Sequence, residues 1–506
     1  MTRSVGAFPG LLSTLAAVVL LLLPLAPASA QRSPGPYVDE ARIPRTPAYA
    51  RAMEVLEAVN RGEADAVDRL IREACAPGFR DAVPAEEHRA IFAEVLAMNG
   101  ALRAHAARVY EPARPETTAT LICFGSVSES WRAIVVEVEP EAPHLITGLS
   151  FNPARTPSDL PPAARLDEAG VVSELGGYLD RLERAGVFSG AVLVAKDGKV
   201  VLTRAMGIAN RDFDAPMALD TKMNLGSMNK MMTGVAIMQL VEAGKISLDD
   251  PISKHLDASW LPNVDKESVK VVHLLTHTSG LGSYFTREWD ERSRAMLRTV
   301  DDWKPLVASE TLAFTPGSEW RYSNTGMLIA GAVVESASGT SYDAYVKERI
   351  TGPAGMTGTA CYELDLVNKN LAVGYEPVTI DGERTFRNNI FMHVMKGGPA
   401  GGGYSTVEDL FRFDRALRSG VLLSEPSLAA LWRAYPEVSS PGYGIGFGID
   451  QTPAGRRVGH SGGFPGISGD LAMYLDEGWT VAVLSNTGGG APMVSNKARQ
   501  LIEQGR

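Results

Sequence analysis

The sequence predicts an α/β (α+β) protein: an antiparallel sheet flanked by helices and joined to a helical subdomain, preceded by a small α+β domain. Three observations predict this fold class. Helical periodicity changes to strand-like periodicity after Gly100, residues 152–166 are rich in proline, and strand patterns lie at both ends of the remaining chain with helical sequence between them. Strands at the two ends of one domain imply a single sheet assembled from distant segments.

The composition of the chain narrows the functions that it can have. Its 506 residues suffice for two or three domains, and 45% apolar with 21% charged residues is an ordinary globular composition. The net charge is −10 and no long basic run occurs, which disfavours a nucleic-acid partner. The sequence leaves the oligomeric state open.

Residues 1–30 are predicted to be a secretory signal peptide. Arg3 supplies the positive charge, residues 11–25 form the apolar segment, and Ala28-Ser29-Ala30 is a small-x-small cleavage site before Gln31. An uncleaved membrane anchor is the alternative. We expect a secreted or periplasmic protein with no stable membrane span after cleavage, because no other stretch is long and apolar enough.

Residues 31–151 are predicted to form the N-terminal α+β domain. Three helices precede four strands, with the helices at residues 47–60, 65–76 and 84–98 and the strands at residues 102–110, 118–125, 131–138 and 145–151. This order of elements resembles the NTF2-like cone fold, in which a curved sheet wraps over helices. The histidines of this domain are scattered along the sequence and indicate no catalytic site.

The spacing of cysteine and histidine indicates neither a metal site nor a disulfide scaffold. Three cysteines, Cys75, Cys123 and Cys361, are too few for such a scaffold at this length. A single Cys75–Cys123 bridge and three buried free thiols both remain open. His273 and His277 are four residues apart, but no glutamate follows His273 as a His-Glu-x-x-His site requires, so we expect packing roles and no metal or organic cofactor.

A proline-rich linker at residues 152–166 leads to the second domain at residues 167–506. An amphipathic helix at residues 168–185 is followed by two strands, at 189–195 and 199–207, around the hairpin signal Asp197-Gly198. Mostly helical sequence then extends to about residue 418. The strands return near the end of the chain, at residues 443–450, 457–462, 469–474 and 479–485, before a last helix at residues 492–503. The terminal helices are expected to pack on one face of the sheet.

The chain contains one Ser-x-x-Lys sequence, Ser227 to Lys230, at the start of an apolar helix. Residues three apart share a helix face, so the hydroxyl and the amine can meet. The amine can take the proton of the hydroxyl only if burial or nearby charge keeps it neutral. Backbone N–H groups at the helix N-terminus suit an oxyanion. The alternative is an N-cap serine followed by a solvated lysine.

Two further stretches carry candidate site residues. Tyr322-Ser323-Asn324 is the only Tyr-x-Asn in the chain; Tyr322 can act as a base if a lysine depresses its pKa, and Asn324 can orient Lys230 and a substrate carbonyl. A turn with a packed tyrosine is the alternative. In Gly459-His460-Ser461-Gly462-Gly463, a strand beside the nucleophile can offer a second oxyanion donor, and Gly463 lets substrate approach closely. A nucleophile elbow is excluded, because its catalytic histidine follows the serine.

Taken in order, Ser227-x-x-Lys230, Tyr322-x-Asn324 and His460-Ser461-Gly462 resemble the motifs of the serine β-lactamase and penicillin-binding-protein superfamily. The resemblance covers residues 168–503 and is to the branch similar to class C β-lactamases, carboxylesterases of that fold and D-amino-acid peptidases. It implies a β-lactamase-like fold and an acylated serine.

The resemblance also implies roles for the individual residues. Ser227 is acylated, Lys230 and Tyr322 share the general-base role, and the N–H groups of Ser227 and Gly463 form the oxyanion hole. Substrate would be bound by a second set, consisting of Asn324, His460, Ser461 and Gly462. His460 stands where β-lactamases of this branch carry a lysine, and an imidazole weakens anion recognition near pH 7.

The sequence therefore predicts a secreted serine hydrolase with a Ser-Lys-Tyr acyl-enzyme mechanism. Its substrate is expected to be a small-molecule ester, amide or peptide, as for a carboxylesterase or D-amino-acid peptidase. Two alternatives stay open. One is a β-lactamase or D-Ala-D-Ala carboxypeptidase of the same fold, and the other is a non-catalytic penicillin-binding-like sensor or binding protein.

Overall fold

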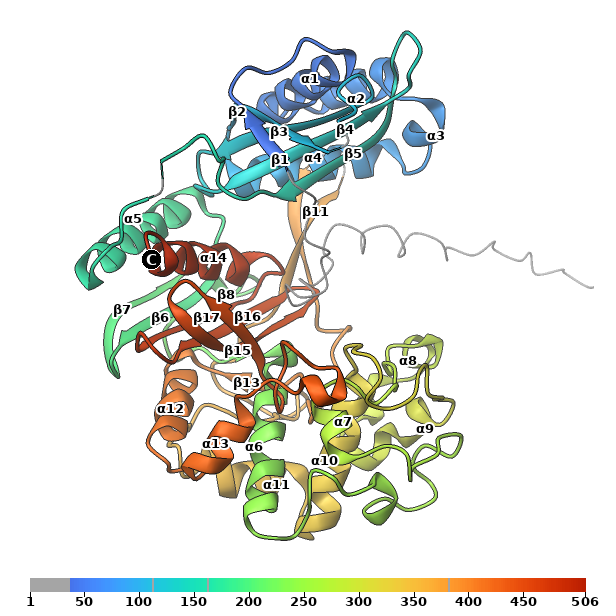
Figure 1. Cartoon of the computed structure of the whole chain (residues 1–506), viewed down its shortest axis with the longest axis vertical. Coiled ribbons are helices and arrows are strands. Elements are labelled where there is room, and N and C mark those ends of the chain that lie inside the picture. Colours follow the sequence, from blue (N-terminus) through green and yellow to red (C-terminus); the bar gives the residue numbers. More distant parts are fainter. Residues whose placement is uncertain (1–36, 112, 162, 381–382) are drawn as a thin grey trace, which may run out of the picture. The chain divides into compact units, whose positions relative to one another are not determined.

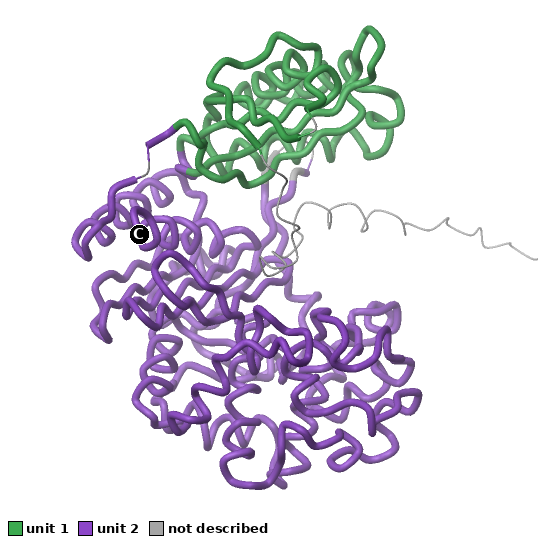
Figure 2. Tube along the Cα trace, viewed as in Figure 1, with its two compact units in different colours: residues 1–126, 130–159 green, residues 127–129, 160–506 purple. Residues whose placement is uncertain are grey.

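The computed structural model describes residues 37–506 except 112, 162, 381 and 382 (Figure 1). These residues form two compact units, coloured separately in Figure 2: one holds the described residues up to Ser126 together with Ser130–Asp159, and the other holds Val127–Glu129 with Leu160–Arg506. The predicted signal peptide lies outside the described residues. Within the described part of the chain, none of the helices combines the length and the apolar character needed to cross a bilayer.

The first unit is a small α+β domain. An antiparallel five-stranded sheet follows the order of the sequence, and α1 packs on β3 and β4. Its helices are α1 (Pro47–Arg61), α2 (Ala64–Ala74), α3 (Pro77–Arg80) and α4 (Ala85–Asn99), and its strands are β1 (Tyr37–Glu40), β2 (Leu102–Tyr110), β3 (Thr118–Gly125), β4 (Trp131–Val138) and β5 (Ile146–Pro153). Cys75 and Cys123 are free and buried in this unit.

One strand of the first unit was not predicted from the sequence. Strand β1 was not predicted, because its four residues carry no alternating pattern; pairing with β2 and the buried ion pair of Asp39 with Arg108 hold it in place. The start of the predicted linker is ordered on the same unit. The backbone N–H of Ser158 donates to Asp39, and Arg108 donates to the carbonyl oxygen of Arg155.

The second unit is built around one antiparallel six-stranded sheet, which confirms the prediction that distant segments form a single sheet. The strand order is β14 (Gly448–Thr452), β15 (Gly455–Phe464), β16 (Ile467–Tyr474), β17 (Trp479–Ser485), β6 (Gly190–Lys196) and β7 (Lys199–Met206). The β6–β7 hairpin turns at Asp197 and Gly198, which have φ values of +49° and +73°. Two positive φ values match the twist of the hairpin.

Helices cover both faces of this sheet (Figure 1). On one face lie α5 (Glu168–Ala185) and α14 (Gly490–Glu503), and on the other lies α12 (Val407–Arg418). Ala191, Leu193 and Ala195 alternate along β6 and join the core on the α12 side. The predicted strand at residues 443–450 begins only at Gly448, because Gly446 adopts a φ of +76° that interrupts an extended chain.

The helical subdomain surrounds α6 (Asn229–Glu242), which is apolar and buried on nearly all sides and contacts α10, α11 and α13. The other helices are α7 (Val271–Leu275), α8 (Arg287–Glu291), α9 (Lys304–Val307), α10 (Asn324–Ser338), α11 (Tyr342–Val346) and α13 (Glu425–Leu431). Short strands accompany them: β8 (Ile208–Asn210) with β9 (Ala215–Pro216), β10 (Met223–Asn224) with β13 (Tyr404–Ser405), and the unpredicted hairpin of β11 (Tyr375–Ile380) and β12 (Glu383–Asn388).

Candidate active site

Ser227 lies in a single 3₁₀ turn, Gly226–Met228, that continues directly into α6. Its neighbours Gly226 and Met228 are buried, whereas Ser227 is half-buried and can be reached from solvent. Gly226 has a φ of +50°, and a Cβ added there would lie 2.7 Å from the nitrogen of Gly463. Both the positive φ and the close contact with Gly463 require glycine at position 226. The turn holds the serine hydroxyl at the edge of the sheet.

The Lys230 amine is fully buried beside the serine. Its Nζ lies 3.0 Å from Ser227 Oγ, 2.9 Å from Asn324 Oδ1 and 2.5 Å from the carbonyl oxygen of Ala400. Burial lowers the pKa of Lys230 well below its ordinary value. A neutral amine has two N–H donors, which match Asn324 and Ala400, and one lone pair, which faces the hydroxyl of Ser227.

Tyr322 completes the group around the serine. Its phenol is hydrogen-bonded to Ser227, and Lys230 Nζ lies 4.9 Å from the centre of its ring. Burial raises the pKa of Tyr322 above its ordinary value, with the Ser227 hydrogen bond opposing the rise. The condition set for Tyr322 as a base, a depressed pKa, is therefore not met: burial favours the neutral form of both the phenol and the amine. This arrangement suits Lys230 as the proton acceptor and Tyr322 as a proton donor.

His460 lies on β15, and both nitrogens of its ring form hydrogen bonds. Nδ1 lies 2.5 Å from the carbonyl oxygen of Ser461 and therefore carries the proton, so Nε2 accepts the hydroxyl of Tyr443 at 2.8 Å. Burial lowers the pKa of His460 to about 3. The imidazole is consequently neutral at pH 7 and presents no positive charge to a substrate carboxylate.

His277 and Tyr443 shape the site, and sequence reasoning had not assigned either residue to it. The ring of His277 packs 4.3 Å from that of Tyr322 and 4.5 Å from that of Tyr443. Its Nδ1 accepts the backbone N–H of Ser323 at 3.1 Å, so it fixes the segment that carries Tyr322. Among the described residues its buried Nε2 has no hydrogen-bond partner. Similarly, Nδ1 of His273 accepts the N–H of Lys270, so both histidines pack as expected.

Strand β15 runs directly against the serine turn. A Cβ added at Gly462 would lie 1.9 Å from the carbonyl oxygen of Leu225 and 3.1 Å from the nitrogen of Ser227. Only glycine therefore permits this approach. Gly463 and Ser461 are exposed at the same edge. The contact brings the backbone nitrogen of Gly463 next to the serine turn, which an oxyanion hole formed together with Ser227 requires.

The glycine-rich segment at residues 397–403 packs against the serine turn. The N–H of Gly402 donates to the carbonyl oxygen of Gly226 at 3.1 Å, and the carbonyl oxygen of Gly403 accepts the N–H of Leu225 at 2.7 Å. A Cβ at Gly401 would lie 2.7 Å from the Gly226 oxygen. This loop therefore approaches the serine turn closely and supports Ser227 and Lys230 through backbone contacts.

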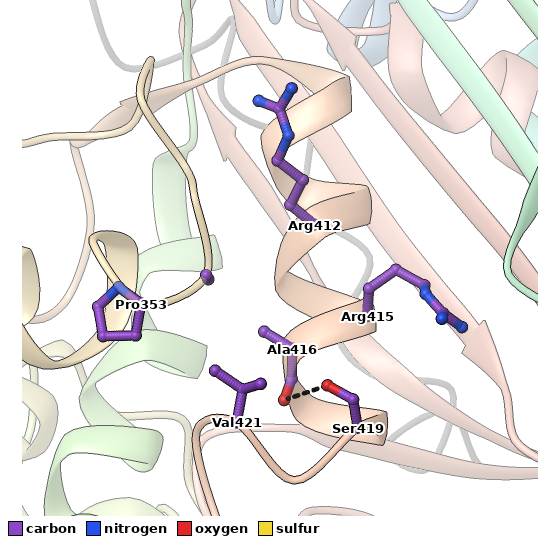
Figure 3. A pocket seen from close by; sticks show the side chains of 7 residues that line it. Pro353, Arg412, Arg415, Ala416, Ser419 and Val421 are labelled. Atoms are coloured by element: carbon purple, nitrogen blue, oxygen red, sulfur yellow. Dashed lines mark hydrogen bonds between the residues drawn. The ribbon is translucent and has the colours of Figure 1, made fainter.

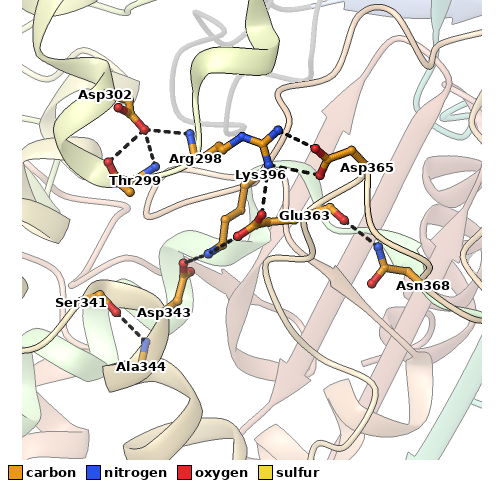
Figure 4. Close-up of polar contacts among 10 residues, drawn as sticks. All are labelled: Arg298, Thr299, Asp302, Ser341, Asp343, Ala344, Glu363, Asp365, Asn368 and Lys396. Atoms are coloured by element: carbon orange, nitrogen blue, oxygen red, sulfur yellow. Dashed lines mark hydrogen bonds and ion pairs between the residues drawn. The ribbon is translucent and has the colours of Figure 1, made fainter.

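Ion pairs anchor the start of this loop (Figure 4). Lys396 lies 2.6 Å from Asp343 and 3.6 Å from Glu363, and Arg298 pairs with Glu363 and Asp365 at 3.0 and 2.5 Å. Of these residues, Arg298, Asp343 and Lys396 line a cavity of about 190 Å³ beside α11. The close-up shows Lys396 directed between the carboxylates, so the network holds the segment that leads to Ala400.

A second hollow, of about 220 Å³, lies elsewhere on the unit (Figure 3). Its lining includes Arg412 and Arg415 of α12, with Pro353 and Val421 facing them. None of the residues around Ser227 described above lines it. This hollow is therefore separate from the group formed by Ser227, Lys230 and Tyr322.

The second unit of the chain is similar to known proteins. Residues 178–506 match the protein family described as Beta-lactamase. Penicillin-binding protein 4* of Bacillus subtilis (strain 168) is 32% identical over 320 residues, which is 59% of this chain and 68% of that protein. Esterase EstB of Burkholderia gladioli is 30% identical over 374 residues, 65% of this chain and 93% of that protein. The crystal structure of a penicillin binding protein from Bacillus halodurans has a TM-score of 0.58 and 32% identity, covering 64% of this chain and 98% of that one.

Proposed function

Since this chain belongs to the Beta-lactamase family, we propose that it is a secreted serine hydrolase that cleaves esters or amides through an acyl-enzyme on Ser227. One observation carries the proposal. The Ser227 hydroxyl lies 3.0 Å from a buried lysine amine, and burial lowers the pKa of that amine. A hydroxyl next to a neutral amine is an activated nucleophile.

In the acylation step, Lys230 takes the Ser227 proton as Oγ forms a bond to the substrate carbonyl carbon. The N–H groups of Ser227 and Gly463 hold the resulting oxyanion. As the bond to the leaving group breaks, Tyr322 gives its phenolic proton to the leaving oxygen or nitrogen and recovers a proton from the Lys230 ammonium. In deacylation, Lys230 takes a proton from a water molecule as the water oxygen attacks the same carbon. The bond from that carbon to Ser227 Oγ then breaks, the acid product leaves, and the Lys230 ammonium returns the proton to Oγ.

The rate should depend on pH through Lys230, because only its neutral form accepts the serine proton. Lowering the pKa extends the neutral form to lower pH, so kcat/KM is expected to rise as pH increases through the Lys230 pKa and then to level off. His460, with a pKa of about 3, should add no step between pH 5 and 8. A pH profile of aryl-ester hydrolysis checks this. A step near pH 6.5 that disappears in His460→Gln would contradict the neutral imidazole.

The neutral His460 also favours esters and uncharged amides over β-lactams, whose recognition in this branch uses a cation at this position. The similarity to Esterase EstB supports the ester branch. We expect a short-chain aryl ester to have the higher kcat/KM when it is compared with a chromogenic cephalosporin under identical conditions. Faster turnover of the cephalosporin would favour a β-lactamase instead.

We further propose that the first unit is an NTF2-like accessory domain and that the chain reaches the periplasm or the cell exterior by its signal peptide. The order of three main helices and an antiparallel sheet supports the first point. The composition of residues 1–30 supports the second. Sequencing the N-terminus of the mature protein tests the cleavage, which we expect before Gln31.

A further inference from the structure

The strand beside the nucleophile, β15, carries a polar and an aromatic side chain on the same face. Side chains alternate along a strand, so His460, Gly462 and Phe464 share a face of β15. The pairing with β16 is regular from His460 to Phe464, so the alternation holds over this segment. The missing side chain of Gly462 points at Leu225 and Ser227. Phe464 therefore lies on the same face as Gly462 and on the opposite side of it from His460.

Aromatic rings from three segments meet at Phe464. Phe285 stacks on it with centroids 6.1 Å apart and planes inclined by 30°, and His393 lies 5.9 Å from it. We name Phe285, His393 and Phe464 the aromatic platform. Burial lowers the pKa of His393 to about 4, so the platform is uncharged at pH 7.

The platform is fixed in place and still open to solvent. Phe285 packs 4.8 and 4.9 Å from the rings of the buried residues Tyr284 and Trp289. Ser283, two residues before Phe285, accepts a hydrogen bond from Asn324, and Asn324 also contacts Lys230. Phe285 nevertheless remains 47% exposed. A large exposed ring that is supported from behind has apolar surface available to a ligand.

The position of the leaving group indicates that the acyl group of the substrate lies at this surface. The leaving group must lie near Tyr322, because Tyr322 supplies its proton. Tyr322 is on the His460 side, with ring centroids 6.3 Å apart. A carbonyl carbon at Ser227 then places its acyl substituent on the other side of Gly462, toward Phe464.

We propose that the aromatic platform binds the acyl part of the substrate and makes the enzyme selective for apolar acyl groups, either aliphatic chains of medium length or arylacetyl groups. This inference rests on the proposed hydrolase function. Each methylene buried on such a surface is expected to raise kcat/KM about fourfold at most. Hexanoyl and phenylacetyl esters should therefore exceed acetyl esters by on the order of tenfold or more.

The test measures kcat/KM for the p-nitrophenyl esters of acetate, hexanoate and phenylacetate, which share one leaving group. The wild type is compared with Phe464→Ala, Phe464→Leu and Phe285→Ala. Phe213→Ala serves as a matched control, because Phe213 is 81% exposed and no part of the platform. We expect Phe464→Ala to lower hexanoate and phenylacetate hydrolysis about tenfold with acetate hydrolysis within about threefold, and Phe464→Leu to restore part of the hexanoate rate.

Two results would overturn the assignment of the platform while leaving the hydrolase intact. One is a wild-type kcat/KM that is the same for the acetate, hexanoate and phenylacetate esters. The other is an equal loss for all three esters in the Phe464 variants, which indicates damage to the neighbouring Gly463 and not to an acyl site. A folded wild type that hydrolyses none of these esters or matched amides would overturn the proposed function and this inference together.

Discussion

Replacement of Ser227 by alanine is expected to lower kcat/KM for the best ester or amide by at least about a thousandfold, which is typical for the loss of a nucleophile. The change removes one oxygen from a half-buried position, so the turn and α6 should keep their structure. Steady-state kinetics on the purified variant measures the loss, and circular dichroism checks the fold.

The matched control for this substitution is Ser336→Ala, since Ser336 is exposed on α10. It should keep the wild-type rate. If Ser227→Ala retained a rate within tenfold of the wild type, the catalytic nucleophile would have to be another residue, and the assignment of the whole site would fail.

Replacement of Lys230 by methionine is expected to lower kcat/KM by about 100- to 10,000-fold, the usual contribution of a general base. Methionine has nearly the volume of the lysine stem and no charge, so it fits a fully buried position whose lysine already favours the neutral form. Asn324 and the Ala400 carbonyl lose a hydrogen-bond donor, so a modest loss of thermal stability should accompany the loss of rate.

The control for the lysine substitution is Lys254→Met, which removes a charge whose side chain is 57% exposed. It should leave the rate unchanged. A Lys230→Met enzyme that stayed fully active while folded would show that a different group accepts the serine proton, and Tyr322 would be the first candidate.

Much of the fold could be predicted from local pattern. Helix α5 and strands β2, β3, β4 and β17 have the bounds that the sequence predicts, because each combines one clear period with clear ends. Elements with no period of their own could not be predicted in this way. Strand β1 depends on β2 and on a buried ion pair, and the β11–β12 hairpin lies in sequence that indicated helices and loops.

The candidate site could also be predicted only in part from the sequence. The motifs identified Ser227, Lys230 and Asn324, which the structure brings within hydrogen-bond distance. The chemistry of Tyr322 could not be predicted, because the direction of its pKa shift depends on burial that only the packed structure defines. The same holds for Tyr443, whose hydroxyl donates to Nε2 of His460 from a position seventeen residues earlier and outside any motif.

The central claim, that Lys230 activates Ser227 for acylation, is tested most directly by intact-mass analysis after reaction with a fluorophosphonate probe, followed by peptide mapping. The wild type, Ser227→Ala and Lys230→Met are compared as folded full-length proteins. We predict a single adduct on Ser227 in the wild type, none at that position in Ser227→Ala, and slow labelling in Lys230→Met. A folded wild type that forms no adduct at Ser227, or forms it equally fast without Lys230, would contradict the claim.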